Sequence, residues 1–221
     1  LYIIPDRKVS LADVREGMRN HYEGTELSMT NDPGAGVYKV PYRWRPMTFK
    51  SEGREYFNER AIATQQTGFV LIAQMRSWLP DAVGGILWFG VDDANTAVLT
   101  PMYTSITEIP ECYRRGNGSM TEFSWTSAFW IHNWVANMAY NRYEPMIRDI
   151  RPVQKELEDS YVDLVKNTDA KALELLKSSP AQATAYLTEV CGKVANEATA
   201  RWKKLGEYLL VKYMDGNVKK E

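Results

Sequence analysis

The spacing of hydrophobic and polar positions changes several times along the chain, and each change marks an expected element. Near the start, apolar residues recur at helical spacing with charged residues between them: Leu11, Val14 and Met18. Ser10 precedes this run and Asp13 stands three positions after it, which is the pattern of a capping box. We therefore expect a helix that begins after Ser10 and ends near Gly24, since glycine commonly terminates helices.

Three runs between residues 68 and 103 have the apolar character and alternation of strands: FVLIAQMR, GILWFGV and AVLTPMY. The connections between them, SWLPDAVG and DDAN, are short, and short connections favour an antiparallel meander. The middle run is almost wholly apolar, which is typical of a strand that is covered on both faces. The pattern therefore predicts an antiparallel sheet that lies between two layers.

Residues 23–60, which precede these strands, show no clean period. The segments TNDPGAG and KVPYRWRPM combine Pro, Gly and Asn with interleaved aromatic and arginine residues, as loops do. A structureless segment of this length is uncommon in a compact domain and is often functional where it occurs. The sequence leaves two interpretations open, a functional loop and a surface crossover.

After the strands the pattern turns helical and stays so. It predicts one long helix or two in line over residues 127–165, which two prolines should kink or break: Pro145 and Pro152. Thr168 is expected to start a short helix, and Ser179 followed by Pro180 has the N-cap signature of a long one. One face of that last helix carries an apolar stripe: Leu187, Cys191, Val194, Ala198, Trp202, Leu205 and Leu209.

This order of elements (helix, loop, strands, then helices) predicts an α+β fold. At 221 residues, with 44% hydrophobic and 25% charged residues, the chain can bury a core of ordinary size. We expect two regions in it. Residues 1–125 would carry the sheet, and residues 126–221 would form a helical region that packs on it.

Composition and charge exclude several classes of function. The net charge is -1, so no basic surface indicates nucleic acid or anionic lipid as a partner. No apolar run reaches the roughly 18–20 residues of a membrane span. The two cysteines form no disulfide framework, and two histidines cannot build a histidine-rich metal centre. We expect no metal ion and no cofactor.

Few residues qualify as catalytic groups by their local sequence. Neither Cys112 nor Cys191 has a histidine nearby in sequence, so both are interpreted as structural. His132 is expected in the core between aromatic neighbours, whereas His21 stands at a helix end that leads into the long loop. The adjacent acids of DDAN, with Asp92 first, could pair for acid–base chemistry, but a hydrogen-bonding role within the turn is favoured.

Arginine residues are the most informative polar group. Arg60 precedes the strands, Arg76 closes the first of them, and Arg43 and Arg45 lie in PYRWRP. An arginine at a strand end beside a pocket can hold a carboxylate through two parallel hydrogen bonds. No complete set of catalytic residues is visible from these patterns.

Three long segments resemble, in the right order, the bacterial dipeptidase A family: HYEGTELSMTNDPGAG, RAIATQQTGFVLIAQMRSWLPDAVGGILWFGVDDANTAVLTPMY and SAFWIHNWVANMAYNRYEPMIRDIRPVQKELED. These proteins are cysteine peptidases of the N-terminal-nucleophile hydrolase superfamily, and the resemblance covers residues 1 to about 165. It implies a four-layer αββα sandwich and the hydrolysis of dipeptides. It also implies that the nucleophile is a cysteine at the start of the mature chain, with its own α-amino group as the base.

The sequence departs from this family at its first position. Leu1 has no nucleophilic atom, neither cysteine lies near the start, and the chain opens LYIIPDRKVS without an initiator Met. We therefore expect this chain to be the C-terminal part of the enzyme, inactive alone, with the missing N-terminal half as its partner. A leader that ended just before the nucleophile would expose it on cleavage, so both a cytoplasmic and an exported parent protein fit.

The resemblance also implies roles for individual residues. Arg60 matches an arginine that stabilises charge near the nucleophile, Arg76 would hold the substrate carboxylate, and Glu23 would hold the amino group of the dipeptide. His21 and Asp92 are expected at the rim of the same site. The alternative is a non-catalytic ligand-binding or oligomerisation domain. Its ligand surface would be the aromatic loop 38–57, and its homo-oligomer interface the apolar helical stripe.

Overall fold

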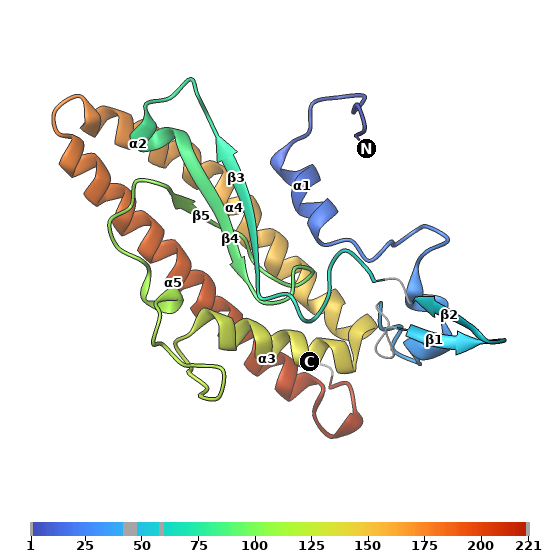
Figure 1. Cartoon of the computed structure of the whole chain (residues 1–221). Helices are drawn as coiled ribbons and strands as arrows, with labels where there is room; N and C mark the ends of the chain where they lie inside the picture. The colour runs from blue at the N-terminus through green and yellow to red at the C-terminus, as the bar shows by residue number, and fades with distance from the viewer. Residues whose placement is uncertain (1, 42–47, 58–59, 220–221) are drawn as a thin grey trace.

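The fold is taken from a computed structural model that describes residues 2–41, 48–57 and 60–219. Figure 1 shows a small sheet crossed by long helices, with a separate hairpin at one side. The helices are α1 (Leu11–Met18), α2 (Asp81–Gly84), α3 (Ala128–Asn141), α4 (Tyr143–Leu176) and α5 (Pro180–Lys212). The strands are β1 (Thr48–Ser51), β2 (Arg54–Phe57), β3 (Phe69–Met75), β4 (Gly85–Val91) and β5 (Thr100–Tyr103). The predicted α+β class is confirmed.

Helix α1 begins as predicted and ends earlier. The side chain of Ser10 accepts a hydrogen bond from Asp13 N, and the Asp13 carboxylate accepts one from Ser10 N, so the capping box is present. The helix stops at Met18, well before Gly24. Beyond it, Asn20 Oδ1 accepts a 2.6 Å hydrogen bond from Tyr22 N, and this local bond offers the backbone an alternative to another helical turn.

Strands β3, β4 and β5 form the predicted antiparallel meander, with β4 in the middle. The register pairs Ile72 with Trp88 across the first two strands, and Trp88 with Pro101 across the next two. Pro101 has no N–H to donate, and its place on an edge strand is the position in a sheet where that loss is tolerated.

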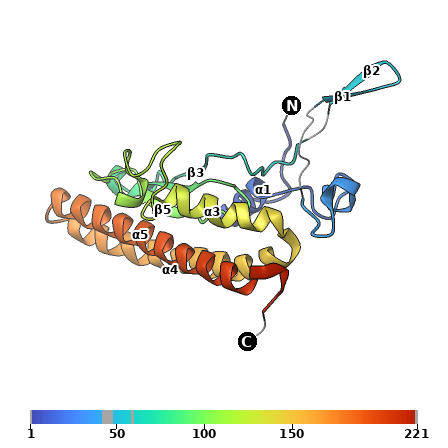
Figure 2. The same ribbon diagram turned by 90° about the horizontal axis from the view of Figure 1, so that it is seen from below.

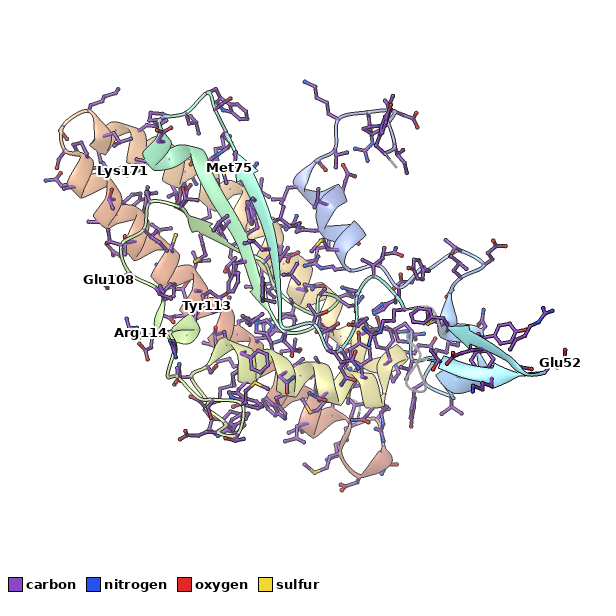
Figure 3. All side chains as sticks on the ribbon, viewed as in Figure 1. Glu52, Met75, Glu108, Tyr113, Arg114 and Lys171 are labelled. Atoms are coloured by element: carbon purple, nitrogen blue, oxygen red, sulfur yellow. The ribbon has the colours of Figure 1, made fainter. Side chains whose placement is uncertain are left out.

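The two faces of this sheet differ in burial. Residues on one face are buried against the helices, among them Val70, Ile72 and Trp88, and Figure 2 shows α4 and α5 together on one side of the sheet. On the other face of β3, three apolar residues are exposed: Phe69 by 63%, Leu71 by 42% and Met75 by 62%. Met75 is labelled near the end of β3 in Figure 3.

The open face is partly covered nearer to β5. There the ring of Phe89 packs edge-on against Tyr113 of the turn η3 (Glu111–Tyr113), with 5.0 Å between ring centroids. The middle strand β4, from which cover on both faces was predicted, is buried or half-buried along its length, and β5 is buried throughout. Among the described residues, the cover is incomplete over one face of β3. A continuous apolar run in β4 could not reveal this, because the exposed apolar residues belong to its neighbour.

The long helices differ from the prediction in where they break. The chain leaves helical geometry at Arg142 (φ -150°, ψ 53°), between α3 and α4, which is close to the expected break at Pro145. Helix α4 then runs through Pro152 and through Thr168, so the separate short helix predicted to start at Thr168 was wrong. Helix α5 begins as predicted, with the Ser179 side chain accepting from Gln182 N.

One main core joins the sheet to the helices. It draws residues from both sides of the boundary expected at residue 125, including Ile86 and Leu99 from the sheet region and Trp202 from α5. The apolar stripe of α5 lies inside this core: Leu187, Cys191, Val194, Ala198, Trp202, Leu205 and Leu209 are all buried. That stripe is therefore not available as an oligomer interface, which removes one support from the binding-domain alternative.

The segment 23–60 is more structured than its sequence suggested. Strands β1 and β2 pair as a hairpin whose turn residues Glu52 and Gly53 both have positive φ (50° and 77°), the conformation that two-residue hairpin turns favour. Figure 3 labels Glu52 at the tip, and Figure 2 shows the hairpin projecting from the body. Phe49 and Tyr56 stack across it with 5.4 Å between ring centroids, yet both are exposed. Arg43 and Arg45 lie outside the described residues.

Candidate functional site

Polar residues from four parts of the chain meet at one end of the β3–β4 ribbon, where Phe69 pairs with Val91. The segment after α1 contributes His21, the DDAN turn after β4 contributes Asp93 and Asn95, and the end of α3 contributes Tyr140. Tyr143 of α4 completes the set. His21, Asp93 and Asn95 are fully buried and the two tyrosines nearly so. We call these five residues the polar cluster.

Hydrogen bonds connect the polar cluster into a chain. The hydroxyl of Tyr140 donates to Asp93 Oδ1 at 3.0 Å, so its oxygen can accept from His21 Nε2, which lies 3.2 Å away. On the other side of the ring, His21 Nδ1 lies 3.2 Å from Asn95 Nδ2, and the Tyr143 hydroxyl donates to Asn95 Oδ1 at 2.9 Å. Each member of the cluster thus orients the next.

Glu23 joins this network at the surface. Its carboxylate accepts from the backbone N–H of His21 at 2.6 Å and lies 3.2 Å from His21 Nδ1. Burial raises the pKa of Glu23, but the hydrogen bonds from the side chain and backbone of His21 outweigh that effect and lower the pKa to about 2. Because the side chain is 47% exposed, Glu23 presents a fixed negative charge that a cationic group can reach.

Asp92 lies beside the polar cluster, and both its backbone conformation and its burial are energetically unfavourable. Its φ of 67° is in the left-handed region, and the residue is 2% exposed. One carboxylate oxygen, Oδ1, accepts from Asn133 Nδ2 of α3 at 2.8 Å, whereas Oδ2 has no hydrogen-bond partner among the described residues. Burial, with the nearby charge of Asp93 adding to it, raises the pKa of Asp92 to about 7 despite the bond from Asn133.

Asp93 is as deeply buried as Asp92, but more neighbouring groups stabilise its charged form. Burial raises its pKa, and the charge of His21 and hydrogen bonds from Thr96 and Tyr140 act against that rise. Strained backbone, an unpaired buried acid and a pKa moved into the neutral range gather at functional sites more often than elsewhere. This end of the sheet is therefore the strongest candidate for a site in the described chain.

The structure brings some of the sequence-predicted residues together and separates another. His21, Glu23 and Asp92 all lie at this end of the sheet. Arg60 is exposed and is tied to the same region, since its carbonyl accepts a 3.1 Å hydrogen bond from Tyr22 OH. Arg76 lies at the opposite end of β3, next to Met75.

The guanidinium of Arg76 is fully engaged within the protein. It pairs with both carboxylate oxygens of Asp169 in α4 and donates to the carbonyls of Val83 and Gly84. The side chain is only 8% exposed. The strand-end arginine therefore does clamp a carboxylate, as its position suggested, but the carboxylate is internal. Arg76 lies outside the candidate site, at the opposite end of β3.

Sequence reasoning missed most of the residues that complete the site. Asn95, Asn133, Tyr140 and Tyr143 had no motif of their own, although DDAN marked the turn that carries the first of them. His132 lies in the core as expected, with its ring stacked on Trp202 at 5.0 Å, and burial lowers its pKa to about 3. It does not belong to the site.

The cysteines do not belong to it either. Cys112 and Cys191 are both buried and free of disulfides. Burial raises the thiol pKa of each, that of Cys191 to about 11, so neither forms a thiolate readily near neutral pH. In the described part of the chain, no group of three or more His, Cys, Asp or Glu side chains is placed to hold a metal ion. None of the helices described has the length and apolarity needed to cross a membrane.

These features define an α+β domain with a buried acid–histidine network at one sheet end and two inert cysteines. Comparison with known protein families shows to which of them the chain is related. The sequence model of the family described as peptidase family C69 matches residues 1–156. The chain therefore belongs to peptidase family C69.

Individual relatives point in the same direction. The chain is 28% identical to a probable dipeptidase of Latilactobacillus sakei over 88% of this chain and 36% of that protein. It is 27% identical to probable dipeptidase B of Lactococcus lactis over 93% of this chain and 38% of that protein. Dipeptidase A of Lactobacillus helveticus is 23% identical over 71% of this chain and 27% of its own length. The chain thus spans less than two fifths of the length of these relatives.

Proposed function

We propose that this chain is part of a dipeptidase that cleaves dipeptides with a cysteine nucleophile at the N-terminus of its mature chain. The observation that carries the proposal is membership of peptidase family C69, together with relatives that are named dipeptidases. The details of the mechanism follow from the resemblance to the dipeptidase A family and from the site described above.

The state of the cysteines supports a nucleophile outside residues 1–221. A nucleophilic cysteine needs an accessible thiol and a lowered pKa, and both cysteines here are buried with raised pKa values. In the proposed mechanism the sulfur belongs to a preceding part of the same protein. The α-amino group of that N-terminal cysteine takes the proton of its own thiol, and the thiolate attacks the scissile carbonyl to form an oxyanion.

The open face of β3 supports the second half of an αββα sandwich. Three apolar side chains stand exposed on it, whereas the opposite face is covered by the helices of this chain. Contiguous exposed apolar surface is typical of a face that another element covers. We propose that a second sheet, supplied by the part of the protein that carries the nucleophile, stacks on this face.

The polar end of the sheet would then bind the dipeptide. Glu23 presents a charged, half-exposed carboxylate that fits the α-ammonium group of an unblocked dipeptide, and the polar cluster holds Glu23 in place through His21. Arg60, which leads into β3 from the same end, is proposed to stabilise the oxyanion. Asp92 is proposed to line the same site, where its pKa near 7 suits a group that exchanges a proton.

The test uses the complete gene product that contains this chain. It should release amino acids from unblocked dipeptides and leave N-acetylated dipeptides intact, and replacing its N-terminal nucleophilic cysteine with alanine should abolish turnover. Residues 1–221 alone should show no turnover. Hydrolysis that survives the cysteine replacement would refute the proposed mechanism.

Two substitutions separate the proposed roles. Arg60→Ala should lower kcat by about 10²-fold or more if the guanidinium stabilises the oxyanion. Glu23→Gln should mainly raise KM for unblocked dipeptides, because it removes the charge that meets the ammonium group. Arg114→Ala, an exposed arginine in the loop after η3, is the matched control and should change neither constant. Unchanged kinetics in Arg60→Ala would remove that residue from the site.

A further inference from the structure

A second polar site lies between α1 and α4, beside the polar cluster. It is a cleft of about 300 Å³. The charged residues around it come from both helices: Arg15 and Glu16 from α1, Arg19 from the C-cap of α1, and Arg151, Lys155, Glu158 and Asp159 from α4. Such a concentration of arginines around a small cleft raises the question of what neutralises them.

One acid serves two buried arginines. Arg15 and Arg19 are 7% and 6% exposed, and both pair with Glu158, Arg19 through a short contact and Arg15 with Nη1 at 3.3 Å from Oε2. Glu158 has a further partner, because its Oε1 also accepts a 2.9 Å hydrogen bond from the backbone N–H of Leu99. The single negative charge of Glu158 therefore faces the positive charges of two guanidinium groups.

A third arginine at the cleft has neutral partners in the described structure. Arg151 Nη1 donates to the carbonyl of Asn95 at 2.6 Å and to Gln154 Oε1 at 2.7 Å. Glu16 lies 3.7 Å from Arg19 but is 77% exposed, so water screens it, and Lys155 and Asp159 pair with each other at the surface. The buried part of the cleft keeps an excess of positive charge.

Two nitrogen atoms of these buried guanidinium groups also make no hydrogen bond within the described structure. Both atoms, Arg15 Nη1 and Arg19 Nε, are buried, and Arg15 Nη1 keeps only its 3.3 Å ion-pair contact with Glu158. A buried charged donor without a hydrogen bond costs more than an exposed one, and a bound ion is one way in which proteins satisfy such a group. An oxygen-rich anion would supply both the missing charge and the missing acceptors.

We propose that this cleft binds a small oxyanion, a phosphate or carboxylate group, with Arg15 and Arg151 as its main contacts. Guanidinium groups match the geometry of both anions through paired hydrogen bonds. The proposal does not depend on peptidase activity. Its two main contacts, Arg15 and Arg151, are given no role in the proposed dipeptide site, although Arg151 adjoins that site through its hydrogen bond to the carbonyl of Asn95, and the proposal would hold for a domain without catalysis.

The test is titration of the protein with inorganic phosphate and with acetate, followed by calorimetry and by thermal unfolding. Chloride at the same ionic strength controls for screening. We expect saturable binding of phosphate and a rise in the unfolding temperature that chloride does not reproduce. A response to acetate as well would identify carboxylates as ligands, and a response to phosphate alone would restrict the site to phosphate groups.

Variants locate the binding. Arg151→Gln, at a partly exposed position, should weaken binding about tenfold while the protein remains folded, and Arg15→Gln should weaken it at least as much. Arg148→Gln lies one helical turn away on the same helix but does not line this cleft, and it should bind like the unsubstituted protein. Binding that is absent, that chloride reproduces, or that survives Arg151→Gln would overturn the proposal.

Discussion

The two ends of the β3–β4 ribbon treat a carboxylate in opposite ways: Asp169 at one end is partly buried and paired, and Asp92 at the other is buried and lacks a countercharge. At the end where Met75 pairs with Gly85, Asp169 receives two contacts from Arg76 and a 2.6 Å hydrogen bond from Tyr103 OH. At the other end, Asp92 has one amide donor, one oxygen without a partner in the described structure, and a left-handed backbone. The carboxylate at the first end thus has a hydrogen-bond partner for both oxygens, whereas the carboxylate at the second end has a partner for only one among the described residues.

The difference indicates which end serves stability and which serves chemistry. A buried carboxylate that is matched by an arginine is held in one protonation state and one position. A buried carboxylate without such a partner keeps its proton into the neutral range, and the fold bears that cost. Because natural sequences seldom keep unsatisfied groups without a use, the Asp92 end is where we expect function. Four substitutions test this contrast.

The largest effect is expected at the satisfied end. Arg76→Gln should lower the free energy of unfolding by about 3–5 kcal/mol, because it removes the charge of a buried guanidinium and leaves the partly buried Asp169 without its countercharge. Urea denaturation measures the change. The control Arg148→Gln removes an arginine that is 73% exposed and should stay within about 0.5 kcal/mol. A small effect of Arg76→Gln would mean that the pair adds little to stability and would weaken the contrast.

At the unsatisfied end, Asp92→Asn should stabilise the protein as pH rises. The folded pKa of about 7 lies above the value near 3.9 of an unfolded aspartate. Below pH 4 both states are protonated; from there to pH 7 only the unfolded state loses its proton, so the stability that Asp92 contributes at low pH is lost. Asn does not titrate and tolerates positive φ.

The stability difference between Asp92→Asn and the unsubstituted protein should therefore grow between pH 4 and pH 8 by about 2–4 kcal/mol. Denaturation at several pH values measures it, and Asp163→Asn, at an exposed position on α4, should show no such trend. A difference that stays constant across this range would show that Asp92 is not held protonated.

A smaller effect is expected within the polar cluster. Tyr140→Phe removes the hydroxyl that joins His21 to Asp93, and it should cost about 1–2 kcal/mol because both groups stay buried with one partner fewer. For the proposed dipeptidase activity of the complete protein, it should also raise KM, since His21 orients Glu23. Tyr2→Phe, at a position 85% exposed, is the control and should be neutral. Equal stability of the two variants would argue against a connected network.

The smallest effect concerns the helix that leads to the cluster. Ser10→Ala removes the N-cap of α1 and should cost about 1 kcal/mol, measured by denaturation. Ser160→Ala within α4 should be neutral or slightly stabilising, because alanine is the better helix former. If the two variants behave alike, the cap does not help to hold α1, and His21 with it, at this end of the sheet.

Much of the fold could be predicted because its signals are local. The capping box at Ser10, the N-cap at Ser179 and the meander of three strands depend on residues close together in sequence, and each was found in the structure. The β1–β2 hairpin was missed because both of its faces are exposed, so no alternation between apolar and polar residues marks it.

The candidate site could be predicted only in part. His21, Glu23 and Asp92 were identified from their positions at a helix end and a turn, but their connection could not be. Tyr140 lies 119 residues from His21, and Glu158 lies 139 residues from Arg19. Arg76 shows the same limit from the other side, because a strand-end arginine looks alike whether its carboxylate comes from a ligand or from a distant helix.

The sequence by itself determined where the main elements begin and which of them carry apolar faces, because caps, turns and periodicity act between near neighbours. Only the tertiary structure decided which charges are buried, which acids find an arginine, and which face of the sheet stays open. The physical reason is that desolvation and pairing depend on every segment that packs around a group, and those segments come together only when the chain has folded.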